Sequence, residues 1–73
     1  MAKAIQVHLS TPVKQGAIHQ MTWMETALKP QKGMIVETKG DRRQWTVIAV
    51  YSISAEIDGL APWKEAARAT AGV

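Results

Sequence analysis

The sequence contains no cysteine and only two histidines in a chain of 73 residues. The lack of cysteine excludes a disulfide framework, and together with so few histidines it excludes a structural zinc site of the Cys/His type. Domains of this size usually depend on a disulfide, a metal or an oligomer interface for stability. A partner or self-association is therefore the remaining candidate support, and a cysteine-free chain fits a reducing cytoplasm.

Long apolar runs are also missing. After Lys3, the polar residues Gln6 and His8 interrupt the segment, which therefore lacks the apolar core of a secretory signal. No stretch approaches the roughly 20 apolar residues of a membrane helix. We therefore expect one soluble cytoplasmic domain spanning residues 1–73, without membrane association. The net charge of +3 permits contact with nucleic acid or an acidic protein surface but requires neither.

The residue groupings that carry catalysis are absent as well. His8 and His19 are the only imidazoles, and a metal site would need both of them together with carboxylates from distant segments. Each is interpreted as an ordinary strand histidine. Gly33, Gly40 and Gly59 are isolated, which is typical of turns and not of a phosphate-binding loop. The sequence thus predicts no enzyme, no catalytic residues, no metal and no cofactor.

Alternating apolar residues predict strands in the first half of the chain. The alternation at residues 5–9 predicts a strand that stops at Ser10–Pro12, followed by a turn at residues 13–16. Residues 17–24 predict a second strand. A helix over residues 21–28 is the alternative, because these residues include good helix formers at three-to-four spacing.

The second half carries the clearest pattern. Residues 34–38 are predicted as a strand, and the segment 39–41 as a turn. The strand at residues 45–53 has apolar side chains on both faces for part of its length, which predicts a position in the middle of a sheet or inside a barrel. One face is expected to carry Trp45, Val47, Ala49, Tyr51 and Ile53. Pro62 and the alanine-rich residues 63–69 predict a short C-terminal helix.

Two segments, Leu28–Val36 and Trp45–Tyr51, resemble part of a known fold. A glycine before a hydrophobic strand, a charged turn and a returning strand led by an aromatic residue resemble the opening hairpin of small SH3-like barrels. The arrangement of Trp23 with these two segments is also similar to small accessory proteins of tailed bacteriophages. The resemblance implies a role in binding host machinery or a virion protein. The expected fold is mainly β, a small antiparallel sheet or SH3-like barrel of four to five strands with a short C-terminal helix.

Basic side chains gather around the hairpin that residues 34–53 are expected to form. The candidate binding residues at its tip and in the preceding loop are Lys29, Lys32, Lys39, Arg42 and Arg43. Arginine suits phosphate or carboxylate contacts because its planar donors match both groups. The alternative is an ordinary solvated turn, and Asp41 weakens the positive charge of the cluster.

Three tryptophans are many for so short a chain. Trp45 and Trp23 are expected in the core or at its border. Trp63 either pins the predicted helix to the sheet or belongs to an interface, and it is therefore included among the candidate binding residues.

Three functional hypotheses follow. The first is a non-enzymatic, phage-type module that binds a host or virion protein through an exposed strand edge, located in the host cytoplasm or in the virion. The second is a small barrel that binds nucleic acid through the basic tip. The third is a structural subunit that associates with itself. We expect a protein partner first, with nucleic acid and self-association as the alternatives.

Overall fold

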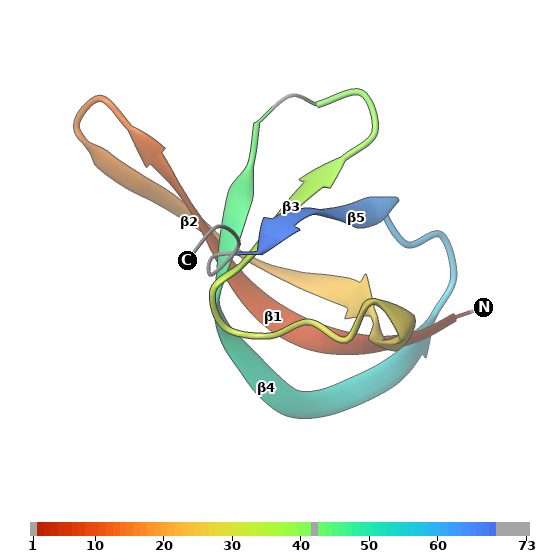
Figure 1. Ribbon diagram of the computed structural model, residues 1–73. Coiled ribbons are helices and arrows are strands. Elements are labelled where there is room, and N and C mark those ends of the chain that lie inside the picture. The colour runs from red at the N-terminus through yellow and green to blue at the C-terminus, as the bar shows by residue number, and fades with distance from the viewer. Residues whose placement is uncertain (1, 42, 69–73) are drawn as a thin grey trace.

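The computed structural model describes residues 2–41 and 43–68 (Figure 1). Over these residues the chain forms one five-stranded antiparallel sheet, in the order β2-β1-β4-β3-β5, and one 3₁₀ turn, η1. The elements are β1 (Ala2–Val13), β2 (Gly16–Glu25), η1 (Thr26–Leu28), β3 (Met34–Thr38), β4 (Trp45–Ile57) and β5 (Trp63–Arg68). The mainly β class is confirmed. Within the described residues the sheet is open, with β2 and β5 at its edges, and the closed barrel is not formed.

The first two strands form a long hairpin around a turn at residues 14–15. The strand expected at residues 17–24 is confirmed, and the helical alternative is wrong, because residues 16–25 pair with β1 along their whole length. The predicted stop at Ser10–Pro12 is also wrong. Pro12 is tolerated in β1 because pairing with β4 ends at Ser10, so the strand has a neighbour on one side only at that point.

Two irregularities bend β4. Ile5 lies opposite Ser54 and Val7 lies opposite Val50, so three residues of β4 face one residue of β1. A further residue is inserted where the register shifts between His8 and Leu9. Such insertions kink a strand and increase its twist. Figure 1 shows the consequence, since β4 curves sharply along its course.

The bend of β4 limits its burial. Trp45 and Val47 are buried, as expected, but Tyr51 is 37% and Ile53 is 53% exposed. The predicted position of β4 in the middle of the sheet is confirmed, since it pairs with β1 and β3. The prediction of one regular face running from Trp45 to Ile53 is wrong for the second half of the strand. A strict period of two describes a side chain's face only where the strand has no inserted residue.

The hydrophobic core lies on one face of the curled sheet. Leu28 of η1 and the partly buried Ile5 and Trp63 pack against it. The buried side chains of the core are Val7, Leu9, Met24, Met34, Val36, Trp45 and Val47. They come from β1, β2, β3 and β4, so one hydrophobic cluster joins the first two strands to the next two.

The predicted C-terminal helix is wrong over its described part. Residues 63–68 form the edge strand β5, which pairs with β3 from Thr38 opposite Trp63 to Met34 opposite Arg68. Residue 69, the end of the predicted helix, lies outside the described residues. The helix propensity of alanine, lysine and glutamate is worth only a few tenths of a kcal/mol per residue, roughly, so pairing and the packing of Trp63 can outweigh it.

Candidate functional site

The basic candidate residues lie in two separate loops. Lys29, with a left-handed φ of 51°, follows η1, and Lys32 lies three residues further on. Lys39 and Arg43 lie in the loop between β3 and β4, while Arg42 is outside the described residues. All four described side chains are exposed. Lys39 and Arg43 thus share the loop between β3 and β4, whereas Lys29 and Lys32 lie in the segment between η1 and β3.

The loop between β3 and β4 has its own internal contacts. The Asp41 backbone N–H donates to the Thr38 carbonyl oxygen at 3.2 Å, and the Arg43 backbone N–H donates to Asp41 Oδ1 at 2.9 Å. Gly40, with φ of 91°, supplies the left-handed backbone that the turn requires. The Asp41 carboxylate therefore lies beside the backbone of Arg43, and its negative charge reduces the positive potential of this loop.

Trp63 does not belong to the basic group. Its side chain is half-buried and packs against the core, so it pins an edge strand to the sheet in place of the expected helix. Its indole Nε1 is buried and has no hydrogen-bond partner among the described residues. A buried donor without a partner lowers the stability of the fold. Trp63 therefore stabilises the protein by packing, while its unpaired Nε1–H offsets part of that gain.

The longest run of exposed residues in the described part of the chain is the end of the β1–β2 hairpin. Pairing between β1 and β4 ends at Ser10 opposite Thr46, whereas β1 and β2 stay paired out to Val13 opposite Gly16. Every residue from 12 to 19 is exposed. We call residues 12–19 the arm. Figure 1 shows it projecting from the rest of the molecule as a two-stranded ribbon.

One face of the arm continues the core face of the sheet. Leu9, Thr11 and Val13 alternate along β1 and therefore share a face, which we call the inner face. Leu9 and Thr11 are buried, but Val13 is 38% exposed. Ile18 lies opposite Thr11, on the same face, and is 42% exposed. The apolar pattern thus extends past the point where the protein's own side chains cover it.

The opposite, outer face of the same hairpin carries both histidines. His8 Nε2 and His19 Nδ1 lie 3.1 Å apart, and one ring donates its N–H to the other. The ring centroids are 5.2 Å apart at an interplanar angle of 64°. Sequence reasoning missed this pair. The predicted turn at residues 13–16 contained the signal, because a hairpin centred there places His8 and His19 on neighbouring positions of one face.

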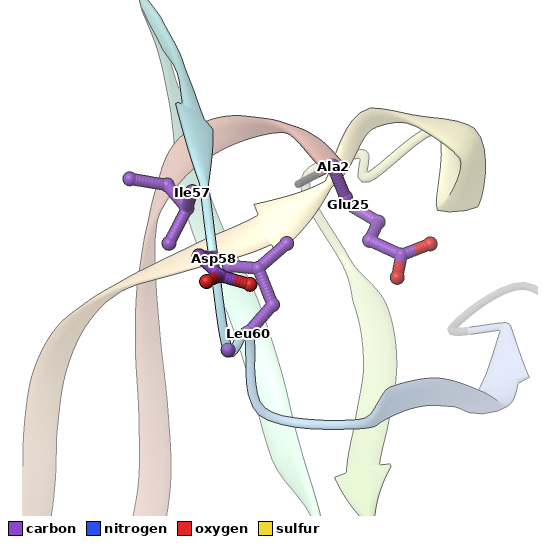
Figure 2. A pocket seen from close by; sticks show the side chains of 6 residues that line it. Ala2, Glu25, Ile57, Asp58 and Leu60 are labelled. Atoms are coloured by element: carbon purple, nitrogen blue, oxygen red, sulfur yellow. The ribbon is translucent and has the colours of Figure 1, made fainter.

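A shallow hollow of about 360 Å³ lies at the other end of the sheet. Figure 2 shows the carboxylates of Glu25 and Asp58 at its border, with Ile57 and Leu60 beside them. Ala2 and Gly59 complete the lining. The hollow is formed where β1 begins and where β2 and β4 end, and none of the sequence-predicted candidates lines it.

Two further findings concern the chain as a whole and not one surface. In the part of the chain that the structure describes, no helix is long and apolar enough to span a membrane. Comparison of the chain with protein families, with curated protein sequences and with solved structures finds no match.

Proposed function

We propose that this chain is a protein-binding module without catalytic chemistry of its own, and that its partner covers the inner face of the arm. The observation that carries the proposal is the exposure of Val13, the next inner-face residue after the buried Leu9 and Thr11, together with that of Ile18, which lies opposite Thr11. Covering apolar surface gains roughly 25 cal/mol per Å² removed from water. A two-stranded ribbon on its own is marginally stable in water, so a partner would also hold the arm in place.

The free edge of β2 supports the same role. β2 is an edge strand, and residues 16–24 contain no Asp, Glu, Lys or Arg. Charged side chains and proline are the usual means by which an edge strand is kept from pairing with another chain. An extended segment of a partner can therefore add to β2 by backbone hydrogen bonds while its apolar side chains contact Ile18.

The partner class follows from the resemblance to accessory proteins of tailed phages. This resemblance favours, as the partner, either a bacterial host protein bound in the host cytoplasm or a virion protein. Either would present an extended apolar segment to the arm.

Site-specific photo-crosslinking tests this proposal. A benzophenone side chain replaces Ile18 in the full chain, which is then irradiated in lysate of bacteria infected with a tailed phage, so that host and virion proteins are both present. The matched control carries the same group at Ile53, which is equally apolar and 53% exposed but lies on β4. We expect one protein adduct from position 18 and none of that size from position 53. Equal adducts from both positions, or none from position 18, would overturn the proposal.

Self-association is separated in the same experiment. Light scattering of the purified protein gives its mass, and an adduct between two copies of the chain identifies the arm as a contact between subunits. That result would favour a structural oligomer subunit and contradict a partner of different sequence.

A second candidate function is nucleic-acid binding by the exposed Lys39 and Arg43. The observation that favours it is the exposure of both cations in the one loop between β3 and β4. The hydrogen bond from Thr11 Oγ1 to the Gln44 carbonyl holds the end of this loop against β1. The arm, with the exposed Lys14 at its turn, separates from the rest of the sheet at the same point. Affinity would then fall steeply as salt rises, through counterion release. Unchanged mobility of DNA and RNA with the protein at low salt would exclude this function.

A further inference from the structure

The contact between His8 and His19 has the dimensions of a metal chelate. Their facing nitrogens are 3.1 Å apart. An ion at about 2.0–2.1 Å from each nitrogen, the usual metal–imidazole distance, would make an angle of about 100° between the two bonds. The ion would replace the shared proton, with each ring turning slightly so that its lone pair points at the metal. The paired strands β1 and β2 already hold both rings at this separation.

The strand register places a third candidate donor, Met21, on the same face as the two histidines. Met21 lies directly opposite His8 in the register, and it shares a face of β2 with His19 two residues earlier. Directly opposed Cβ atoms lie about 4.5–5.5 Å apart, within reach of a flexible methionine. Met21 is 48% exposed, whereas the core methionines Met24 and Met34 are buried. Its thioether is therefore available at the surface.

The chemistry of these donors selects the ion. Among the described residues, no three or more histidine, cysteine, aspartate and glutamate side chains gather into a metal-binding group. The remaining donor set is two imidazoles and a thioether, without a carboxylate. Thioether ligands favour copper(I) over magnesium, calcium or manganese, which prefer oxygen. The sequence-based expectation of no metal site considered histidines with carboxylates and left methionine out.

We propose that His8, His19 and Met21 bind one copper(I) ion on the outer face of the β1–β2 hairpin. The ion joins the two strands at the base of the arm, where His19 is its last residue, and adds a cross-link where the hairpin leaves the rest of the sheet. This proposal is independent of the protein-binding role, because the ligands lie on the face opposite Val13 and Ile18.

Anaerobic competition of the full chain against a chromophoric copper(I) chelator tests the site. We expect one copper(I) per chain. His8→Gln and His19→Gln should each lower the affinity at least about tenfold, since even loss of an outer-shell partner of a metal ligand typically costs 10–100-fold. Met21→Leu keeps the shape of the side chain but removes the thioether, and should also weaken binding.

The control is Met24→Leu, which changes a buried methionine on the inner face and should leave the affinity unchanged. Absence of competition, or an unchanged affinity in the double variant His8→Gln with His19→Gln, would overturn the site. If Met21→Leu binds copper(I) as tightly as the original chain, the assignment of the thioether, and with it the preference for copper(I), is wrong.

A measurement on the unsubstituted protein does not depend on the folding of variants. Copper(I) is diamagnetic, so the ring resonances of His8 and His19 can be followed by NMR during the titration. Both sets should shift together and saturate at one equivalent. Shifts confined to one ring, or to neither, would contradict a shared ion.

Discussion

Thr11 donates its hydroxyl hydrogen to the carbonyl oxygen of Gln44 at 2.8 Å, between residues 33 positions apart in the chain. Thr11 is 3% exposed and is the one buried polar side chain among the described residues. The bond lies just beyond the last β1–β4 pair, Ser10 opposite Thr46. It therefore fixes the point at which the arm separates from the sheet, and it ends the loop that carries Lys39 and Arg43.

Removing this hydroxyl should destabilise the protein. Thr11→Val preserves the shape of the side chain but leaves the Gln44 carbonyl without its partner, which should cost about 1–3 kcal/mol in the free energy of unfolding. The control is Thr26→Val, because the Thr26 hydroxyl donates to the Lys3 carbonyl at 3.3 Å at an exposed site. Its cost should stay below about 0.5 kcal/mol. Denaturant unfolding measures both, and equal costs would contradict the importance of the Thr11 bond.

The core position of β4 is tested by truncation. Val47 is fully buried, so Val47→Ala should lower the free energy of unfolding by about 1–3 kcal/mol through lost contacts and an unfilled cavity. Val50→Ala is the matched control on the same strand, since Val50 is 37% exposed and should lose much less. A negligible change for Val47→Ala in thermal or chemical melts would mean that the register of β4 is different.

The unpaired indole of Trp63 leads to a third prediction. Trp63→Phe keeps an aromatic ring against the core but removes a buried donor that has no partner among the described residues. The gain from removing that donor, about 1–3 kcal/mol, should largely offset the lost ring area, so stability should change little. Trp63→Ala loses the ring and should be clearly destabilising. A large loss for Trp63→Phe would contradict the expected balance between the removed donor and the lost ring area.

The arm can be altered with little effect on folding. Val13→Ser combined with Ile18→Thr replaces two side chains that are more than a third exposed, so the unfolding free energy should change by about 0.5 kcal/mol or less per site. Binding of the partner identified by crosslinking should be lost. Ile53→Thr is the control and should retain binding. Retained binding in the arm variant would place the partner elsewhere on the surface.

A charge reversal separates the two binding candidates. Arg42→Glu with Arg43→Glu should leave folding intact, because Arg43 is exposed and turn residues contribute little packing. Loss of nucleic-acid binding with retained protein binding would favour the basic loop as the functional surface. If protein binding is lost while the circular dichroism spectrum is unchanged, the arm alone does not account for recognition.

Sequence reasoning worked best where a segment's structure depends on its own residues. The strand at residues 34–38 and the start of β4 at Trp45 were predictable because alternating apolar side chains have one buried face in any sheet. The turn at Gly40 was predictable because glycine adopts its backbone conformation without steric cost. Placement of Trp45 in the core followed from its size and apolar character.

Reasoning from the sequence failed where a segment's structure depends on its neighbours. Residues 63–68 have the local preferences of a helix, yet β3 offers them an edge to pair with and the core offers Trp63 a place to pack. The exposure of Tyr51 and Ile53 depends on extra residues of β4 that lie opposite β1. The alternation of apolar residues in β4 does not reveal these insertions. The candidate binding residues were chosen by charge, and charge alone does not identify the apolar arm.

The sequence by itself determined a small mainly β domain with its principal turns, because strand and turn preferences act within a few residues. Only the tertiary structure decided the strand order, the bend of β4, the strand at the C-terminal end and the projection of the arm. It also brought His8 and His19 into contact. Each of these depends on which strands pair and in what register, and the free energy of such contacts belongs to pairs of segments and not to either one alone.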